Sequence, residues 1–271
     1  MPELPEVETT KQQLELYLQQ NTLLRCEVRR ANLRWPVSPE ISLLHHVPIR
    51  SLSRRGKYLV LSLEEGYILI HLGMTGFFKV LHTEVPPEKH DHIDLFLKCG
   101  TILRYNDSRR FGCWLWFEQL EQVKPLQHLG VEPLSEELSV DYLQRRFRGK
   151  KLGIKQAIMD AHCIVGVGNI YASEALFCAR IHPLTPAGQL DACSLYRLIK
   201  AIRSVLEEAL RSGGTTIRDF QQPEGKLGYF AQKLQVYNRA GKACRVCETV
   251  IENRRIGQRS SYFCPNCQKP V

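Results

Sequence analysis

The sequence lacks long apolar runs, internal repeats and any alternation of strands and helices typical of βαβ units. No segment approaches the roughly 20 consecutive apolar residues that a membrane-spanning helix needs. The first residues also lack the basic-then-apolar pattern of a secretory signal peptide. These absences argue against a membrane protein and against a parallel-sheet nucleotide-binding fold, and they predict a cytoplasmic protein that does not bind membranes.

Acidic residues are also in short supply. The 271 residues include 37 Lys and Arg against 28 Asp and Glu, which gives a formal net charge of +9. A basic balance of this size favours an anionic partner, and nucleic acid is the commonest large one. The hydrophobic content of 44% and the charged content of 24% are ordinary for a globular protein. The length suits two or three domains.

The opening Met1-Pro2-Glu3-Leu4-Pro5-Glu6 precedes a predicted helix over residues 7–18, whose apolar stripe is Val7, Leu14 and Leu18. Proline is tolerated in a first helical turn, where the N–H groups have no intrahelical partner. If Met1 is removed, Pro2 becomes a secondary amine at a helix start, where the macrodipole favours its unprotonated, nucleophilic form. An ordinary helix start is the alternative.

Two β-hairpins are predicted in the first half of the chain. One joins residues 58–63 to 67–72 through Glu64-Glu65-Gly66, and the other joins 93–97 to 101–105 through Lys98-Cys99-Gly100. Short strands at this spacing predict a β-sandwich. Polar residues fall at the strand ends, where a sandwich presents binding residues, although solvated turns would look the same. They are Arg54–Lys57, His71, Gly73–Gly76, His90–His92 and Asp107–Gly112.

Glycine and proline around residues 129–135 break the strand pattern and predict a domain boundary, with a helix beginning near Ser135. Helices are expected near residues 136–147, 153–160, 171–179 and 189–212, so that the second domain is helical. Between two of them lies the glycine-rich turn 164–168, followed by Asn169. Such a turn at a helix start lets backbone N–H groups bind a phosphate. Residues 213–230 are expected to form a long exposed loop.

The tail carries a more specific pattern. Cys244-x2-Cys247-x16-Cys264-x2-Cys267 has the spacing of a four-thiolate zinc site, and a disulfide-linked tail is the less favoured alternative. Four protein ligands leave no open position, so the predicted Zn²⁺ is structural. The intervening residues predict a hairpin whose tip carries Arg254, Arg255, Gln258 and Arg259. The remaining cysteines are scattered without a framework, and we expect plain, partly buried side chains: Cys26, Cys99, Cys113, Cys163, Cys178 and Cys193.

Taken together, these motifs resemble those of formamidopyrimidine-DNA glycosylases, in the same order and over essentially the whole chain. The segments that carry the resemblance are Pro2–Thr9, Gly56-Lys57, His71–Met74, Asp107–Gly112, Gly166–Glu174, Gly228–Phe230 and the four cysteines.

The resemblance implies a bifunctional base-excision enzyme that removes 8-oxoguanine and formamidopyrimidines from duplex DNA and then cleaves the strand at the abasic site. Pro2 is similar to the nucleophile that attacks the sugar, and Glu3 to the acid that protonates the ring oxygen. Lys57 is similar to the proton donor of β-elimination and Arg259 to that of δ-elimination. A secondary amine suits this chemistry, because the iminium it forms acidifies the neighbouring carbon without a redox cofactor or a catalytic metal.

DNA contacts are implied in the same way. His71 and Asn169 match phosphate ligands, and His90, Arg109 and Lys150 match contacts to the DNA backbone or to the orphaned base. Met74, Arg109 and Phe111 match the wedge that fills the gap left by an extruded nucleotide, an apolar-and-basic combination that suits base flipping.

The implied fold is α+β and multidomain. Residues 1–131 would form a catalytic β-sandwich with a flanking helix, and residues 132–230 a helix-two-turns-helix domain with a lesion-covering loop. Residues 235–269 would form a zinc-ribbon finger. The implied molecule is a monomer with one structural Zn²⁺, located in a bacterial-type cytoplasm and associated with the nucleoid through DNA.

Two departures and two rival functions remain open at this point. Arg218 stands where family members often have lysine, and Ser108 replaces a common proline. An endonuclease VIII-like enzyme for oxidised pyrimidines is one rival, although those relatives begin Pro-Glu-Gly-Pro and this chain has Leu4. The other is a non-catalytic protein that binds damaged DNA, against which Pro2, Glu3, Lys57 and Arg259 argue.

Overall fold

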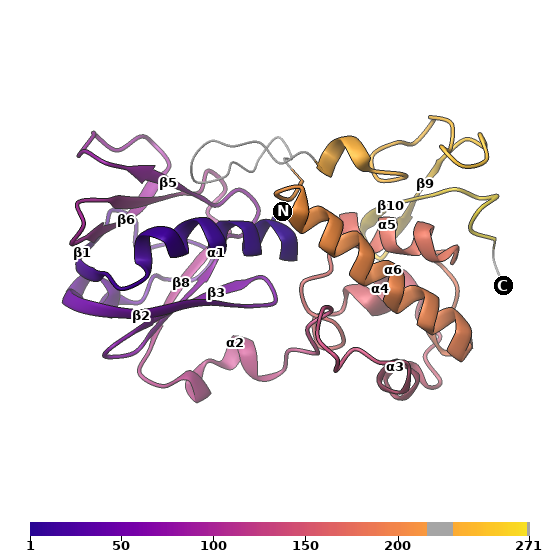
Figure 1. Ribbon diagram of the computed structural model, residues 1–271, viewed down its shortest axis with the longest axis horizontal. Helices are drawn as coiled ribbons and strands as arrows, with labels where there is room; N and C mark the ends of the chain where they lie inside the picture. Colours follow the sequence, from indigo (N-terminus) through magenta and orange to yellow (C-terminus); the bar gives the residue numbers. More distant parts are fainter. Residues whose placement is uncertain (216–229, 270–271) are drawn as a thin grey trace. The chain divides into compact units, whose positions relative to one another are not determined.

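The computed structural model describes residues 1–215 and 230–269 (Figure 1). It divides into two compact units, Met1–Gln127 with Ser212–Ala231 and His128–Arg211 with Gln232–Val271. The predicted exposed loop after Gly213 lies mostly outside the described residues, as do Arg218 and Tyr229. Within the described ranges, no helix combines the length and the apolar character needed to cross a bilayer.

The first unit begins with helix α1 (Leu4–Leu18), one turn earlier than its apolar stripe alone predicts. Pro5 occupies the first turn, and Val7, Leu14 and Leu18 are buried as predicted. Pro2 precedes the helix instead of lying within it, because Glu3 is the N-cap residue.

Eight strands follow α1 and form one antiparallel sheet in the order β5-β7-β6-β1-β2-β3-β4-β8. Both predicted hairpins are present, as β3–β4 and β6–β7. Short helical turns lie outside the sheet, namely the 3₁₀ segments Pro39–Leu43 and Leu120–Gln122 and helix α2 (Lys124–Gln127). The strands are β1 (Thr22–Val28), β2 (His45–Arg55), β3 (Tyr58–Leu63), β4 (Tyr67–His71), β5 (Phe77–Leu81), β6 (Asp91–Leu97), β7 (Ile102–Asn106) and β8 (Cys113–Phe117).

The sheet folds over onto itself as a sandwich. Strand β2 is long enough to serve both layers, since its first part pairs with β1 and its remainder with β3. Strands β5 and β8 stand at opposite ends of the strand order, yet the rings of Phe78 and Trp114 lie 5.9 Å apart. Tyr105 of β7 packs against the same tryptophan at 5.4 Å. The predicted sandwich with a flanking helix is therefore confirmed, and α1 contributes to the larger of its apolar cores.

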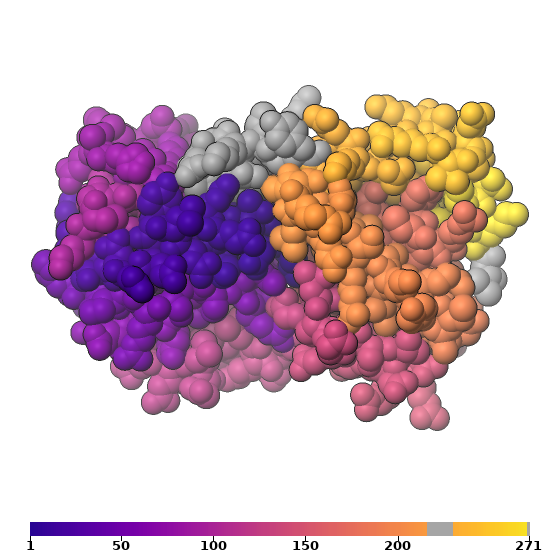
Figure 2. Space-filling model, in the orientation of Figure 1, coloured from indigo at the N-terminus to yellow at the C-terminus, as the bar shows by residue number. Residues whose placement is uncertain are grey.

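The second unit is helical, as predicted, with α3 (Val140–Phe147), α4 (Ile154–Met159), α5 (Asn169–Ala179) and α6 (Ala192–Arg211). Helix α3 begins later than expected. Ser139 caps it by accepting the Tyr142 N–H, whereas the Ser135 hydroxyl donates to the Glu132 carbonyl in a turn. Helix α6 buries its apolar stripe, which includes Leu198 and Ile202, and its outer side lies at the surface (Figure 2).

The tail of the second unit folds into a two-stranded ribbon, β9 (Glu252–Ile256) and β10 (Arg259–Phe263), preceded by the 3₁₀ turn Phe230–Lys233. The turn between the strands is Gly257-Gln258, and both residues have positive φ. Two of the four cysteines precede the ribbon in the sequence and two follow it, and they share a small core with Phe177 of α5. The predicted zinc ribbon is confirmed, and its predicted tip residues Arg254, Arg255, Gln258 and Arg259 are exposed.

Candidate active site and zinc centre

The N-terminus of the first unit is fixed by a buried carboxylate. Pro2 and Glu3 are both buried, the latter with 2% exposure. Glu6 stands three residues after Glu3, and its Oε2 accepts the Glu3 N–H at 2.8 Å, as in a capping box. The chain start is therefore held by hydrogen bonding instead of fraying.

The same carboxylate reaches a distant part of the chain within this unit. Glu6 Oε1 accepts the Thr215 N–H at 2.7 Å, and Gly214 packs against the Glu6 side chain. A Cβ added at Gly214 would lie 3.1 Å from Oε1 on a backbone with φ of +79°, so the close approach favours glycine. Glu6 thus ties the chain start to the segment that precedes the undescribed residues 216–229.

Two further predicted residues, Lys57 and His71, lie near each other, the first directly after Gly56 in the turn between β2 and β3 and the second at the end of β4. Burial, together with the charges of Lys57 and Arg34, lowers the pKa of His71 to about 4. Its Nδ1 accepts the Gly73 N–H at 2.9 Å, which leaves the proton of the neutral ring on Nε2. Lys57 and His71 can each donate a hydrogen bond to an oxyanion.

The predicted wedge residues Met74, Arg109 and Phe111 sit on two loops that the structure brings together. The Arg109 guanidinium lies 4.9 Å from the centre of the Phe111 ring. Phe111 is 43% exposed, which is unusual for a large apolar side chain and suits insertion between bases. Gly73 makes the contact between the loops possible, because a Cβ there would lie 2.4 Å from the Phe111 backbone.

Asp107, which is fully buried, holds both loops. Its Oδ1 accepts the Thr75 hydroxyl at 2.6 Å, and its Oδ2 accepts the Gly112 N–H at 2.8 Å. The Thr75 hydroxyl oxygen in turn accepts the Arg109 N–H at 3.1 Å. His90 is connected to this cluster through its carbonyl, which accepts the Asp107 N–H at 3.0 Å. The Asp107 carboxylate therefore positions both wedge loops, and the Asp107 backbone N–H holds the strand end that carries His90.

In the second unit, Asn169 is the first residue of α5, so the glycine-rich turn opens a helix as predicted. The amide Oδ1 of Asn169 accepts the Lys155 ammonium at 2.6 Å, and its Nδ2 donates to the Ser260 carbonyl at 2.9 Å. Ser260 directly follows Arg259 in β10. The structure therefore brings Asn169 and the ribbon that carries Arg259 together.

Lys155 is the centre of that junction and is 1% exposed. Besides Asn169, its ammonium donates to the Ser261 hydroxyl at 2.6 Å and to the Ser260 carbonyl at 3.1 Å. Lys150, the other predicted contact in this unit, lies in the connection between α3 and α4. Its backbone is fixed by the Gly188 N–H, which donates to the Lys150 carbonyl at 3.0 Å.

The four cysteine sulfurs lie within 4.8 Å of one another. A tetrahedral Zn²⁺ with Zn–S bonds of about 2.3 Å needs sulfurs about 3.8 Å apart, and the Cys247–Cys264 and Cys244–Cys267 separations are 3.4 and 4.0 Å. The backbone N–H of Val246 donates to the Cys244 sulfur, and the backbone N–H of Cys267 donates to the Cys264 sulfur. The donor set fits a structural zinc ion.

Glu174 of α5 joins the helical part of the unit to the segment that leads to the ribbon. Its buried carboxylate accepts the N–H groups of Gln235, Val236 and Tyr237 at 2.8–3.0 Å. Burial raises the pKa of Glu174, and the three backbone hydrogen bonds oppose that shift. The finger is therefore attached to α5 by main-chain hydrogen bonds as well as by the core around Phe177.

Sequence reasoning did not single out Glu6, Asp107, Lys155 and Glu174 for these positioning contacts. Glu6 carried a detectable signal, since a Glu three residues after an N-cap position is a capping-box pattern. Nothing local marks Lys155 as buried, because its partners lie 14 residues later, at Asn169, and about a hundred residues later, at Ser260 and Ser261.

Comparisons with known proteins cover nearly the whole chain. Residues 1–114 match the formamidopyrimidine-DNA glycosylase N-terminal domain, residues 129–221 the H2TH domain of the same enzymes, and residues 241–270 a zinc finger found in FPG and IleRS. The formamidopyrimidine-DNA glycosylase of Edwardsiella ictaluri is 52% identical over 99% of this chain and 100% of its own length.

Comparison with solved structures leads to the same family. The MutM (Fpg) protein from Thermus thermophilus has a TM-score of 0.89 and 37% identity, with both chains covered completely. The Lactococcus lactis Fpg in complex with DNA containing an abasic site has a TM-score of 0.90 and 31% identity over 98% of this chain and 99% of that one. Full-length identity at this level, together with the shared fold and the four-cysteine finger, shows that the chain belongs to the formamidopyrimidine-DNA glycosylase family and is a base-excision repair glycosylase.

Proposed function

We propose that this chain excises oxidised purines, namely 8-oxoguanine and formamidopyrimidines, from duplex DNA and nicks the resulting abasic site by β,δ-elimination. The observation that carries the proposal is the buried N-terminus, in which Glu6 holds the Glu3 N–H and so fixes the neighbouring Pro2. An immobilised secondary amine beside a carboxyl group is what attack on a sugar carbon requires.

The chemistry follows from those two residues. The Pro2 nitrogen attacks the anomeric carbon, a carbon–nitrogen bond forms, and the glycosidic electron pair leaves with the damaged base, which takes up the proton that the Pro2 nitrogen releases. Protonation of the ring oxygen by Glu3 opens the sugar and gives an iminium. Its positive charge stabilises loss of a proton from the adjacent carbon, after which the 3′ phosphate leaves and the 5′ phosphate follows. Pro2 must be free for this sequence, so Met1 has to be removed.

Lys57 is the proposed proton donor for β-elimination and Arg259 for δ-elimination. Two neutral donors assist them at the phosphates, His71 through Nε2–H and Asn169 through its amide. The low pKa of His71 keeps its ring neutral near pH 7, so its donor proton stays on Nε2 when Lys57 is charged. Lys150, His90 and Arg109 are the proposed contacts to the DNA backbone and the orphaned base.

Met74, Arg109 and Phe111 form the proposed wedge. Extrusion of a nucleotide leaves a gap in the base stack, and an apolar side chain in that gap offsets part of the unstacking cost. The stacking of Arg109 on Phe111 supports a joint insertion, in which the guanidinium hydrogen-bonds the orphaned base while the ring fills the space.

The proposal extends to the organisation of the chain. Residues 1–131 form the catalytic domain, 132–230 the helix-two-turns-helix domain with the lesion-covering loop, and 235–269 the finger with a structural Zn²⁺ at Cys244, Cys247, Cys264 and Cys267. The partner is duplex DNA, the working form is a monomer in the cytoplasm, and no redox cofactor or catalytic metal takes part.

Borohydride trapping tests this function. The protein with a free Pro2, verified by intact mass, is incubated with a duplex containing 8-oxoguanine and with borohydride, which reduces the imine to a stable amine. We expect a covalent adduct at the N-terminal peptide. The matched control carries an N-terminal extension that keeps Pro2 in a peptide bond, where the nitrogen is an amide and cannot form the imine. Equal adduct yield from both proteins would remove Pro2 from the mechanism.

The same assay separates the rival functions. An endonuclease VIII-like enzyme would trap on duplexes with an oxidised pyrimidine in preference to 8-oxoguanine. A non-catalytic binding protein would bind both duplexes and trap on neither. The Leu4 after Glu3 and the combination of Met74 with Phe111 favour the purine-specific enzyme.

A further inference from the structure

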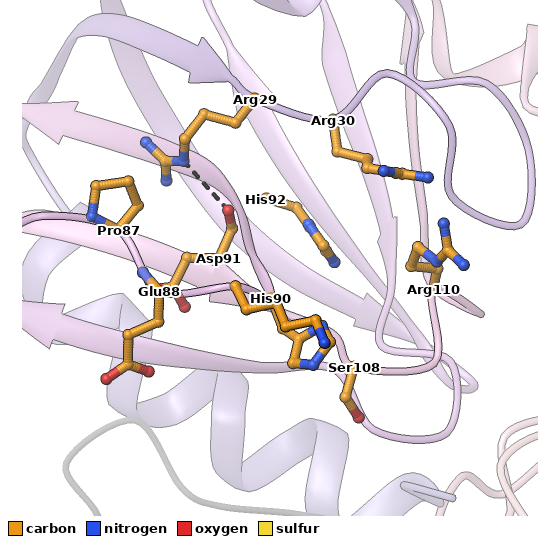
Figure 3. A pocket seen from close by; sticks show the side chains of 10 residues that line it. Arg29, Arg30, Pro87, Glu88, His90, Asp91, His92, Ser108 and Arg110 are labelled. Carbon is orange, nitrogen blue, oxygen red and sulfur yellow. Dashed lines mark hydrogen bonds between the residues drawn. The ribbon is translucent and has the colours of Figure 1, made fainter.

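A basic cavity of about 470 Å³ lies in the first unit, beside the start of β6 and the turn after β7. Its size falls within the range of ligand pockets. Figure 3 shows the guanidinium groups of Arg30 and Arg110 reaching toward the same space as the ring of His92. None of these three side chains takes part in the proposed glycosylase chemistry.

Two carboxylates line this pocket, and both are already engaged. Glu88 pairs with Lys79 at 2.6 Å. Asp91 accepts the Asn106 amide at 2.7 Å and the Glu88 N–H at 2.9 Å, and it also pairs with Lys79. Lys79 is shared by both carboxylates and offsets part of their charge, and Arg104, 3.7 Å from Asp91, offsets more of it.

The positively charged residues of the pocket fall into two groups, one paired with a carboxylate and one not. Arg29 is committed to the buried Asp94, with its two terminal nitrogens 2.6 and 3.1 Å from the carboxylate, and its Nε donates to the Asp91 carbonyl (Figure 3). Arg30, Lys89 and Arg110 are exposed, and among the described residues none of them has a carboxylate within ion-pair distance. The pocket thus presents three uncompensated positive charges around one cavity.

A buried histidine lies beside the same cations. His92 is buried, and its Nε2 lies 2.8 Å from the Asp107 carbonyl, which fixes that nitrogen as the donor. Burial lowers the pKa of His92, the hydrogen bond to Asp107 and the charge of Asp107 oppose that shift, and the nearby His90 and Arg30 add to it. An anion bound in the pocket would act in the opposite direction.

The backbone at Arg110 is also unusual. Its φ is +57°, in the left-handed region that residues other than glycine and asparagine seldom adopt. The Arg110 N–H donates to the Asp107 carbonyl at 3.3 Å, so the turn is closed by the residue that also holds the wedge loops. This turn sends Arg109 toward Phe111 and Arg110 into the wall of the pocket. Strained backbone of this kind gathers at functional sites.

We propose that Arg30 and Arg110, with Lys89 beside them, form a phosphate-binding site for the backbone of duplex DNA. The inference rests on the proposed function, because Arg110 directly follows the wedge residue Arg109 and His90 lines the same pocket. Phosphates recur about every 3.4 Å of helix axis in each strand, so a strand that passes Arg109 brings a phosphate to this pocket. Two guanidinium groups suit such a group, since each can bind two of its oxygens.

The test compares the salt dependence of binding to an undamaged duplex. Arg30→Gln/Arg110→Gln should lower the slope of log affinity against log salt by about 1 and weaken binding by about tenfold at low salt. Arg50→Gln/Lys98→Gln is the matched control, because it removes the same charge from exposed positions of the same unit that do not line the pocket. Arg30→Lys/Arg110→Lys should restore most of the slope, since it retains the charge.

Three results would overturn the inference: an unchanged slope in the Gln variant, an equal decrease in the control, or a Lys variant that behaves like the Gln variant. A further arm uses inorganic phosphate at constant ionic strength and follows the His92 ring by NMR. Phosphate binding without any change in the DNA slope would identify a site for free anions and reject the DNA contact. The salt slope involves no chemistry, so failure of the wild type to form a borohydride adduct would count against the proposed glycosylase mechanism and not against this pocket.

Discussion

The two units anchor their candidate DNA-contacting residues on different buried groups, although the second unit also has a carboxylate, Glu174, that accepts backbone N–H groups. In the first unit, the carboxylates Glu6 and Asp107 accept backbone N–H groups from loops that lie far apart in the sequence. In the second, the ammonium group of Lys155 donates to Asn169 and to the ribbon, and a four-cysteine centre closes the ribbon at its base. In both, a buried polar centre with several partners acts beside apolar packing to fix a loop, and such a centre is costly to leave partly satisfied.

Removal of the metal should have the largest effect, because it acts on the whole ribbon. Structural zinc sites contribute on the order of 10 kcal/mol to the folding of small fingers, and the finger core includes the cysteines themselves. Cys264→Ser, or treatment with a chelator, should unfold the ribbon and lower DNA affinity by at least about 100-fold. Zinc content, circular dichroism and fluorescence anisotropy with labelled DNA measure the three consequences.

Cys99→Ser is the control for that substitution, since Cys99 is exposed in the β6–β7 turn and belongs to the other unit. The first unit should stay folded in the chelated protein, because its core contains no residue of the ribbon. A chelated protein with undiminished DNA affinity would show that the finger does not position the DNA-contacting residues.

Lys155→Met should produce the next largest effect. The change leaves Asn169 Oδ1 and the Ser261 hydroxyl without the charged donor that bonds each at 2.6 Å. Loss of one partner from a buried charged network costs about 3 kcal/mol. Thermal unfolding should show the loss, whereas Lys151→Met, at an exposed position of the same segment, should stay within about 0.5 kcal/mol of the wild type. Equal stability of the two variants would mean that the Lys155 bonds are not maintained in solution.

Asp107→Asn tests the corresponding centre in the first unit. One carboxylate oxygen becomes an NH₂ group that faces a donor, either the Thr75 hydroxyl or the Gly112 N–H. We expect a loss of about 2 kcal/mol, together with displacement of the wedge loops. Fluorescence of 2-aminopurine opposite or next to the lesion would report weaker nucleotide extrusion than in the wild type. Normal extrusion with normal stability would contradict the assigned role of Asp107.

These centres also mark the limit of what sequence predicts. The hairpins, the four-cysteine finger and the helix that begins at Asn169 follow local patterns of alternation, cysteine spacing and glycine placement, and they were predictable. The closure of β5 against β8 was not, because the Phe78–Trp114 contact depends on how far β2 bends. The start of α3 was wrong for a local reason, since both Ser135 and Ser139 are suitable caps and only Ser139 accepts a helical N–H.

The candidate site also contains residues that could be predicted from the sequence and residues that could not. The chemistry of a secondary amine suggested a nucleophile at Pro2, whereas the roles of Glu3, Lys57, Arg109 and Phe111 followed from the resemblance to the family. Glu6, Asp107 and Lys155 act on other parts of the protein. Apart from the Glu3–Glu6 capping box, which is a local pattern, their importance depends on partners 5 to 209 positions away in the sequence, and no local periodicity encodes such pairs.

His71 gives the smallest expected effect at neutral pH, where its ring is already neutral, and its contribution is tested by the pH dependence of stability. Its pKa in the folded protein, about 4, lies below the ordinary value of 6.5. Between these values the unfolded chain binds more protons than the folded one, so stability rises with pH through this window and is complete above it. The shift corresponds to about 3 kcal/mol as an upper bound. His71→Asn retains an acceptor for the Gly73 N–H and should flatten the pH dependence between pH 4 and 6.5. Because zinc loss in acid affects both proteins equally, the difference between their unfolding free energies isolates His71, and parallel curves would show that its ring is not held neutral by burial beside Lys57.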